Sequence, residues 1–597
     1  MNSISNQNIK ITMSGYPGEL ISIIINDEYL DAEKYHLFVN QFALHSDSNG
    51  SWRGEYWGKF VRGACACYKA KPSSRLYHTI ENSVFEMASL LEEDGTLSSY
   101  VKEERLSGWD VWGRKYAMVG FLSYLEISQS KSKKAKILNV LKKQANAFMA
   151  KVGKGKGKKG ILETARIYGS LASVSILGVY VDLYSLTGRK AYLDFARYII
   201  STGLCATDDL FAEVMKEDSY PYQWNSKKAY EMCACFQGLL RYGTVTGEQK
   251  YIDASIAFAR KVAESEFTIT GGIGTDSEFF NHASIMQTEK PAKPSLETCV
   301  TVAFMGLFLD LLNYTKDAYY ASLLETMSYN ALFGAFNDLE QTMVLSEGRV
   351  WNLEGYVTVP HEKYCFDSYS PLVSDRRCQV IGGFLVMQEG KTYGCCAANG
   401  GYGLGLVPEF AFQKEEEGYV VNFYNSFNAK SVWNEKEIRF SMRANLYQSG
   451  KAVLKIKGQG EQFSLKLRIP SWGKMSISLN GTPITGAKEE KGYLVLNRVW
   501  NEDNLVIRFS LPLVCHSLNE KVAYTRGPIV LAEDARLDGF TNPLPKKARG
   551  KRVKNDSFKN NLTVELSSGE RLCDYSSAGK NMDDPHSGLT VWADIKK

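Results

Sequence analysis

The sequence predicts a multidomain α+β protein in which a toroid of paired helices is followed by an antiparallel β-sandwich region. Three observations carry this prediction. The chain has 597 residues, too many for one ordinary core. Apolar residues recur with a helical period from about residue 31 to 412, and short strand-like runs follow from about residue 413. The hydrophobic share of 44% and the charged share of 23% are typical of a globular protein.

The first 30 residues are predicted to be an N-terminal β segment that packs on the β region. Their stretches "IKITMSG" and "LISIIIND" alternate polar and apolar residues. This alternation is typical of short, half-buried strands, so we expect a strand in each stretch.

The helical region, residues 31–412, contains one pattern three times. The copies are "YSLTGRKAYLDFA" (184–196), "YGTVTGEQKYIDA" (242–254) and "LNYTKDAYYASLL" (312–324). In each copy a threonine precedes a tyrosine by five residues, with a long apolar helix before it and an amphipathic helix after it. The threonines lie 59 and 69 residues apart, which is too long and uneven for a simple solenoid repeat. Such copies suit a toroid of helix pairs whose inner helices are apolar on nearly all sides.

The region from residue 413 to 540 is predicted to be a β-sandwich domain. Its strand-like runs include "YVVNFYNSF", "FSLKLRIPSW", "YLVLNRVW" and "NLVIRFSL", and turn signals such as "NG" at 480–481 separate them. Residues 541–597 are more polar and are predicted to be a C-terminal β extension.

Charge and hydropathy exclude two classes of partner. The net charge of +5 is small for this length and gives no case for nucleic acid. The most apolar segment, 167–186, carries Asp182, several serines and two glycines. We therefore interpret it as a buried helix rather than a membrane span.

Cysteine usage and the N-terminus bear on the compartment. The 12 cysteines show no regular framework, so reduced thiols are favoured over disulfides. The start, "MNSISNQNIKITMSG", has neither a basic region nor an apolar run. We expect a cytoplasmic protein; the alternative is a periplasmic or secreted protein whose signal has been removed. A homodimer is one of the oligomeric states that the sequence leaves open.

Two neighbouring cysteines, Cys395 and Cys396, stand in the turn-rich stretch "YGCCAANGG" (393–401). Adjacent thiols are poorly placed for a structural disulfide, but two thiolates in one turn can reach a single metal ion.

Upstream, "SLETCVTVAFMGLFLDLL" (295–312) places Glu297 and Cys299 where the chain enters an apolar helix, with Ser295 as its N-cap. Three thiolates and a carboxylate would form a four-coordinate site, and zinc prefers that set over magnesium, calcium or manganese. The alternative is that Cys299 belongs to the core and the cysteine pair to a tight loop; spacing alone does not decide between the two.

Glu278 is a candidate general acid. It follows the glycine-rich loop in "TITGGIGTDSEFFN" (268–281) and is flanked by Phe279 and Phe280. Apolar surroundings raise the pKa of a carboxyl group and keep a proton on it near neutral pH. The alternative for a single glutamate is a solvated loop residue between two packed phenylalanines.

These motifs occur in one order along the chain: "GGIG…E", then "ETC" heading a helix, then "CC…N", then "LRIPSW…LNG…GYLVL…W…RGPIVLAED". In this order the sequence resembles the zinc- and cysteine-dependent β-L-arabinofuranosidases, glycoside hydrolase families 127 and 146, as a divergent member. The resemblance extends from the helical region to about residue 534. It implies an (α/α)6 barrel followed by β-sandwich modules, and a retaining exo-glycosidase that acts on an oligosaccharide or glycoside.

The resemblance also implies roles for particular residues. Glu297, Cys299, Cys395 and Cys396 would hold zinc, and Cys395 would also be the nucleophile. Glu278 would be the acid/base. Zinc deprotonates a bound thiol, so a thiolate would take the place of the carboxylate that most retaining glycosidases use.

The sequence departs from the family pattern at the substrate pocket. The family usually has C-C-P-P-N, where this chain has "CCAANG", and it presents histidines from inner helices where this chain has Lys115 and Lys228. Lysines would suit a sugar with a carboxylate or another anionic group, so the substrate-binding group is expected to include both. Trp109, Asp110 and Tyr369 are further candidates for lining the sugar pocket.

The sequence leaves three other functions to be considered. Another (α/α)6 enzyme, such as an unsaturated-uronide hydrolase or a sugar epimerase, would use carboxylates or histidines and no metal. A carbohydrate-binding protein would have a closed, structural zinc site. A thiol redox protein is disfavoured because no C-x-x-C in a thioredoxin-like order is present.

Overall fold

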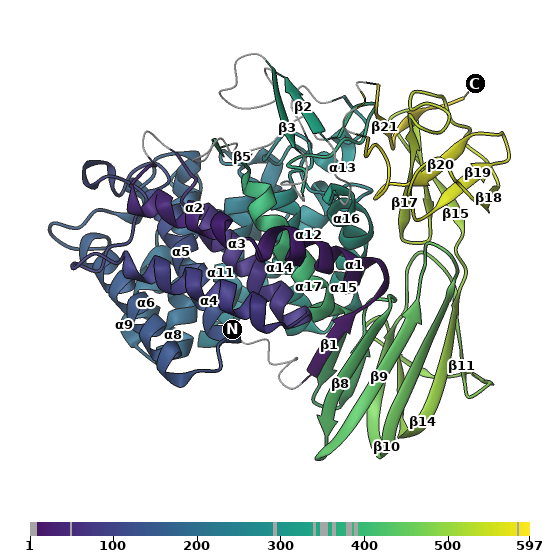
Figure 1. The fold of residues 1–597 in the computed structure, drawn as a ribbon, viewed down its shortest axis with the longest axis horizontal. Helices are drawn as coiled ribbons and strands as arrows, with labels where there is room; N and C mark the ends of the chain where they lie inside the picture. Colours follow the sequence, from purple (N-terminus) through teal and green to yellow (C-terminus); the bar gives the residue numbers. More distant parts are fainter. Residues whose placement is uncertain are drawn as a thin grey trace.

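The computed structural model shows a helical barrel followed by β-sheets (Figure 1). The residues that it describes are 9–596 apart from 48–50, 291–294, 338–341, 347–355, 361–365, 378–384, 387–391, 582–583 and 585. The predicted fold class, an (α/α)6 barrel followed by antiparallel β structure, is confirmed.

In the described part of the chain, six helices form a closed inner ring in which each helix contacts the next. They are α3 (Glu55–Ala70), α5 (Asp110–Ile127), α8 (Leu177–Thr187, preceded by the short α7, Leu171–Val174), α11 (Ala229–Thr246), α14 (Thr298–Thr315) and α17 (Cys395–Ala411). Each is entered from an outer helix, so all six run in the same direction. Their N-terminal ends therefore meet at one end of the barrel.

The outer layer alternates with the inner one along the chain. Its helices are α2 (Ala32–Ala43), α4 (Ser74–Ser89), α6 (Lys131–Lys151), α9 (Lys190–Ile200), α12 (Gln249–Ser265) and α15 (Ala318–Thr326). Shorter helices complete the region: η2 (Lys102–Glu104), η3 (Ile161–Glu163), η4 (Tyr168–Ser170), α10 (Leu210–Met215), η5 (Pro221–Gln223), α13 (Ala283–Met286), η6 (Met327–Leu332) and α16 (Phe333–Ala335).

The repeated threonine marks the turn from an inner to an outer helix. Thr187, Thr246 and Thr315 are the last residues of α8, α11 and α14, and each hydroxyl accepts a hydrogen bond from the amide two residues later, at 3.2, 3.4 and 3.3 Å. The residue after each threonine is left-handed, with φ of 66°, 73° and 56°. This positive φ ends the helix and lets the chain reverse.

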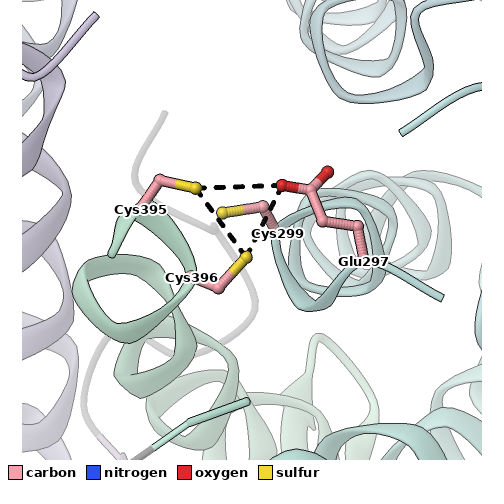
Figure 2. Close-up of side chains that lie close together, drawn as sticks. All are labelled: Glu297, Cys299, Cys395 and Cys396. Atoms are coloured by element: carbon pink, nitrogen blue, oxygen red, sulfur yellow. Dashed lines mark hydrogen bonds between the residues drawn. The ribbon is translucent and has the colours of Figure 1, made fainter. Parts of the chain in front are cut away.

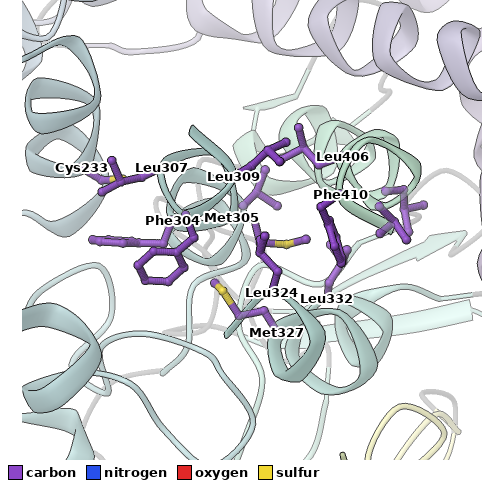
Figure 3. Close-up of a cluster of buried hydrophobic side chains, with 14 of the residues drawn as sticks. Cys233, Phe304, Met305, Leu307, Leu309, Leu324, Met327, Leu332, Leu406 and Phe410 are labelled. Carbon is purple, nitrogen blue, oxygen red and sulfur yellow. The ribbon is translucent and has the colours of Figure 1, made fainter. Parts of the chain in front are cut away.

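Helix α14 shows why the inner ring looks apolar on all sides. Its side chains pack against α11, α15, η6 and α17 at once (Figure 3). Two segments, Tyr168–Thr187 and Thr298–Thr315, are long and apolar enough to cross a membrane by length and composition. Inside the barrel 67% and 72% of these windows are buried, as expected for core helices.

The first β-sheet begins directly where α17 ends. Its strands are β1 (Ile9–Met13), β6 (Phe412–Glu415), β7 (Gly418–Val421), β8 (Phe427–Trp433), β9 (Lys436–Ala444), β10 (Lys451–Arg468), β11 (Met475–Leu479), β12 (Thr482–Ile484), β13 (Lys488–Glu490) and β14 (Tyr493–Phe509). The pairing is antiparallel except between β7 and β10. In β8 and β9 buried and exposed residues alternate, so one face covers the core and the other meets solvent.

A second sheet follows, in the order β15-β16-β17-β20-β19-β18, with β21 and β22 at its side. Its strands are β15 (Leu513–Leu518), β16 (Lys521–Arg526), β17 (Ile529–Asp534), β18 (Gly550–Val553), β19 (Thr563–Leu566), β20 (Arg571–Asp574), β21 (Leu589–Thr590) and β22 (Ala593–Asp594). Two small hairpins, β2 (Thr342–Ser346) with β3 (Tyr356–Pro360) and β4 (Leu385–Val386) with β5 (Thr392–Tyr393), lie between α16 and α17 in sequence.

One of the two strands predicted near the N-terminus is wrong. "IKITM" forms β1, which pairs with β8 in the first sheet. "LISIIIND" instead lies in α1 (Gly15–Ile24) and the π-helix η1 (Ile25–Tyr29). The buried residues of α1 are Pro17, Leu20, Ile21 and Ile24, a spacing of i, i+3, i+4 and i+7 that belongs to a helix packed against the barrel.

The barrel and the first sheet share a buried ion pair between Glu325 of α15 and Arg468 at the end of β10; their side chains are 1% and 0% exposed. Trp472 donates to the other Glu325 oxygen at 2.7 Å, and Arg468 donates to the Asn422 carbonyl at 2.6 Å. Hydrogen bonds of this kind offset the desolvation of two buried charges.

Replacing Glu325 by alanine is expected to lower the free energy of unfolding by about 3 kcal/mol or more, because Arg468 would stay buried without a counter-charge. Differential scanning calorimetry checks this. The matched control is Glu437→Ala, which breaks the exposed pair with Arg439 and is expected to leave the melting temperature unchanged. Equal melting temperatures for both variants would contradict the role of the buried pair.

Candidate active site

Four predicted site residues meet at the N-terminal end of the inner ring. Cys395 and Cys396 open α17, and Cys299 lies in the first turn of α14 (Figure 2). The N-cap of α14 is Glu297 and not, as predicted, Ser295, because the helix begins only at Thr298. Their donor atoms all lie within 4.8 Å of one another, and all four residues are buried. The two halves of the group are about a hundred residues apart in sequence and adjacent in space because α14 and α17 are neighbours in the ring.

The individual distances are short. The sulfur of Cys396 lies 3.5 Å from the Glu297 carboxyl, and that of Cys395 lies 3.9 Å from both the carboxyl and the other sulfur. The Thr298 hydroxyl donates to the Asp367 carbonyl at 2.6 Å, which anchors the "ETC" turn to the loop at 366–377.

The members of this group oppose one another's ionisation, because they are buried and close together. Burial, and then the charge of Cys395, raise the pKa of Glu297 to about 8. Burial opposes ionisation of Cys299, but hydrogen bonds from Cys395 and Cys396 and the charge of Lys59 outweigh it and lower its pKa to about 6. Hydrogen bonding to Cys299 contributes most to the raised pKa of Cys395. The four ionisable groups therefore hold little negative charge between them. A bound cation would favour the ionised form of each group. Among the described residues, this is the one group able to hold a metal ion.

Lys59 of α3 adds a fixed positive charge that the sequence analysis missed. Its Nζ lies 3.7 Å from the Cys299 sulfur and 2.8 Å from a Glu55 oxygen, and its side chain is 3% exposed. The signal was present: Glu55 and Lys59 stand four residues apart in "GEYWGKF", at the same end of an inner helix as the cysteines.

Asn399, the retained asparagine after the cysteine pair, fixes α17 to its neighbours. It accepts a hydrogen bond from Arg62 at 2.6 Å and donates to the Cys299 carbonyl at 3.5 Å. Arg62 also lies over the Tyr402 ring, 4.0 Å from its centroid. The chain thus holds Cys299 and the cysteine pair in register through Asn399.

Glu278 lies in the loop that leads from α12 to α14. Its side chain is 26% exposed. The Tyr369 hydroxyl donates to a Glu278 oxygen at 3.4 Å and is itself 3.2 Å from the Ser277 hydroxyl. Tyr369 is buried, and burial, followed by the charge of Glu297, raises its pKa. Tyr369 therefore lies between the candidate acid and the cysteine group.

Lys228, a predicted substrate ligand, has a partner inside the protein. It forms an ion pair with Glu278, and its residue is 5% exposed. Its positive charge is therefore already paired within the protein. Lys228 thus gives no support for an anionic substrate, and Lys115 is the other lysine that suggested one.

Lys115 is buried in α5. Its Nζ is 3.1 Å from the Ser175 hydroxyl and 4.2 Å from the centroid of the Trp112 ring. Burial lowers its pKa to about 7. Lys115 lines a cavity of about 1150 Å³ whose walls are mainly the second halves of the inner helices, toward the end opposite the cysteines.

The remaining candidates divide between packing and pocket. Both oxygens of Asp110 are used within the protein: they accept hydrogen bonds from Ser98 at 2.5 Å, the Leu106 amide at 2.7 Å and Arg114 at 3.0 Å. Asp110 thus anchors the entry to α5. Trp109 is half-buried, and its ring lies within 6.0 Å of Tyr168 and 5.9 Å of the Lys228 ammonium, on the same side as Glu278.

Comparisons with known proteins identify the family of this chain. The family model described as beta-L-arabinofuranosidase, GH127 catalytic domain, matches residues 19–345, and the GH127 middle domain matches residues 419–513. A comparison with curated protein sequences gives no match.

Solved structures show the same fold over the whole length. The GH127 beta-L-arabinofuranosidase Ara127N-Se from Geobacillus stearothermophilus T6 has 18% sequence identity and a TM-score of 0.72, with 99% of this chain and 100% of that chain covered. A GH127 beta-arabinofuranosidase has 18% identity and a TM-score of 0.74, covering 100% and 99%. A third structure, described as a glycoside hydrolase, has 16% identity and a TM-score of 0.68, covering 98% and 97%.

Fold, site and comparisons together define a carbohydrate-cleaving enzyme, a glycoside hydrolase. The chain belongs to glycoside hydrolase family 127, the family of β-L-arabinofuranosidases, as its motifs predicted.

Proposed function

We propose that this enzyme is a retaining exo-glycosidase that cleaves a β-L-arabinofuranoside-like furanoside, with Cys395 as nucleophile and Glu278 as acid/base. The observation that carries the proposal is the buried group of three thiols and one carboxyl at the N-terminal end of the inner ring of a GH127 barrel. The names of the similar structures support the sugar class, since two of them are arabinofuranosidases.

Zinc is the metal we propose for this group. Thiolate-rich, four-coordinate sites favour zinc over magnesium or calcium. Ligand atoms about 2.0–2.3 Å from a tetrahedral zinc lie roughly 3.5–3.8 Å from one another. The separations of 3.5 and 3.9 Å between donor atoms are close to this size, and all four donor atoms lie within 4.8 Å of one another. Lys59, next to Cys299, would offset the net negative charge of three thiolates and a carboxylate. When bound, zinc keeps the cysteines deprotonated and in place at neutral pH.

The chain's own residues then divide the reaction between them. The Cys395 sulfur attacks the anomeric carbon, and the bond to the leaving oxygen breaks as that oxygen gains a proton through Glu278. Water then attacks the same carbon, gives its proton to Glu278 and releases the sulfur. Two displacements at one carbon retain the configuration.

Activity on a panel of p-nitrophenyl furanosides and pyranosides, with and without a chelator and a thiol reductant, tests the function. We expect turnover of the β-L-arabinofuranoside and loss of turnover with the chelator. Turnover of pyranosides or uronides alone, unaffected by chelation, would favour a metal-independent (α/α)6 enzyme and contradict the proposal.

Glu278→Gln is expected to lower kcat/KM on an alkyl furanoside by about 10²-fold or more, since general acid catalysis contributes at least that much. The rate of covalent adduct formation with an activated aryl furanoside should fall far less, because a good leaving group needs no proton. Stopped-flow measurement of the first turnover checks this. An equal loss on both substrates would contradict the assigned role.

A further inference from the structure

The pairing of Lys228 with Glu278 is built into the backbone. The Ala229 amide donates to the Glu278 carbonyl at 3.0 Å, and the Phe280 amide donates to the Lys227 carbonyl at 2.9 Å. These bonds flank an antiparallel bridge between Lys228 and Phe279. The start of α11 and the loop that carries the candidate acid are therefore held side by side, and the ion pair is not a chance contact of two mobile side chains.

Three aromatic rings surround the Lys228 ammonium, whose one close counter-charge among the described residues is the Glu278 carboxyl. Its Nζ lies 4.9, 5.3 and 5.9 Å from the ring centroids of Tyr168, Phe279 and Trp109. Aromatic faces attract an ammonium group. Lys228 is also the N-cap of α11, where the helix dipole favours an anion and disfavours a cation. The paired ammonium thus favours the ionised form of the Glu278 carboxyl.

An ionised Glu278 carries no proton of its own to donate. A general acid must carry a proton before the leaving oxygen departs. In an ion pair the transferable proton is on the ammonium nitrogen, and the carboxylate only accepts. The carboxylate can therefore deliver a proton only as it receives one from its partner.

We propose that Lys228 and Glu278 act as one proton-sharing unit, in which the Lys228 ammonium holds the proton that Glu278 passes to the leaving oxygen. The inference rests on the proposed function, in which Glu278 is the acid/base. Lys228 acts through Glu278 and is a positioning and proton-holding residue rather than a substrate ligand.

Each proton that the pair donates when the sugar bonds to Cys395 is returned when water releases the sugar. When Cys395 bonds to the anomeric carbon and the carbon–oxygen bond breaks, the leaving oxygen takes a proton from Glu278, and Glu278 takes one from Lys228. Lys228 is then a neutral amine and Glu278 remains a carboxylate. When water displaces the sulfur, its proton passes to Glu278 and on to Lys228, which restores the ion pair.

Other ionisable groups face this unit and set its environment. Tyr168 and Tyr369 lie against Lys228 and Glu278, and Asp276 lies in the same loop. The Lys228 charge also acts on Glu231 of α11 and Glu297 before α14, and it favours the ionised form of both carboxyls. Burial nevertheless raises the pKa of Glu231. The carboxyl that forms the ion pair with Lys228 is that of Glu278.

Three substitutions separate proton transfer from simple positioning. Lys228→Arg keeps the positive charge and the ion pair, but a guanidinium does not give up a proton. Lys228→Met removes the charge and leaves Glu278 to hold its own proton among aromatic rings. Lys228→His offers a proton on a shorter side chain. Lys227→Met, at the exposed neighbouring lysine, is the control.

The readout is kcat/KM against pH on an alkyl and an aryl furanoside. We expect Lys228→Arg to lose about 10²-fold on the alkyl substrate and little on the aryl one. Lys228→Met should lose less at acidic pH, with its alkaline limb moved to lower pH. Lys228→His should recover part of the loss. Wild-type rates for Lys228→Arg on the alkyl substrate, or equal losses on both substrates, would overturn the proposal.

Infrared difference spectra against Glu278→Gln give a readout that does not depend on turnover. Wild type is expected to show carboxylate bands from Glu278 at neutral pH, and Lys228→Met a protonated carboxyl band. A protonated carboxyl in wild type overturns the proposal. Carboxylate bands together with no turnover of any furanoside would overturn the proposed function, and with it the proton route, while the ion pair itself would stand.

Discussion

Replacing Cys395 by serine is expected to reduce turnover at least about 10⁴-fold, the scale of losing a catalytic nucleophile. A serine hydroxyl stays protonated at neutral pH and needs a neighbouring base. Among the described residues, Lys59 lies 3.7 Å from the Cys299 sulfur but is a cation, and the Glu297 oxygen is itself one of the proposed metal ligands. Neither can act as that base.

The metal content of the same variant is expected to change little. Three proposed ligands, Glu297, Cys299 and Cys396, remain in place, and a hydroxyl or a water can complete a tetrahedral set. Zinc measured by elemental analysis should stay near one per chain in Cys395→Ser.

Cys396→Ser is the matched variant, since it changes the adjacent thiol of the same helix turn. We expect it to weaken zinc binding and to keep activity that excess zinc partly restores. Full activity in Cys395→Ser, or an equal and irreversible loss in both variants, would contradict the division of roles between the two cysteines.

Removing the metal is expected to abolish activity and to lower the melting temperature, with both restored by added zinc. Binding to the folded state alone stabilises by about 4 kcal/mol at a free concentration a thousandfold above Kd. The cysteine group joins α14 to α17, so loss of the proposed zinc should loosen the N-terminal end of the inner ring. Calorimetry with and without a chelator in reducing buffer measures the shift.

The control for the metal experiment is another buried thiol of the inner ring. Cys299→Ala should remove the zinc-dependent rise in melting temperature, whereas Cys233→Ala, in α11, should keep it. A chelator that changes neither activity nor melting temperature in freshly reduced protein, together with no zinc uptake, would contradict the metal site.

The helical barrel could be predicted because its signal is local and repeated. Thr187, Thr246 and Thr315 end an inner helix and cap the next turn through their own hydroxyls, so a short pattern carries the geometry. The helix at 15–24 was missed for the opposite reason. A run of isoleucines has high β propensity, and packing on the barrel, which follows the helical period, overrides it.

The cysteine group could be named from the sequence only through the family resemblance. Cys299 and Cys395 are 96 residues apart, and the ring contact between α14 and α17 brings them together. The contact between Lys59 and Cys299 and the pair between Lys228 and Glu278 could not be predicted from the sequence. Each contact joins side chains from different elements, and the direction of these side chains depends on how the barrel packs. The spacing of apolar or charged residues along the sequence does not give that direction.

Cys395 is the residue that we propose to form the covalent bond to the sugar. Intact-protein mass spectrometry after incubation with an activated β-L-arabinofuranoside, followed by peptide mapping, tests it most directly. The trapping is best done in Glu278→Gln, where the second step is expected to be slow and the adduct to accumulate. We expect one sugar mass on Cys395 and none in the matched Cys395→Ser protein. A sugar mass on a carboxylate, or an adduct that persists in Cys395→Ser, would contradict it.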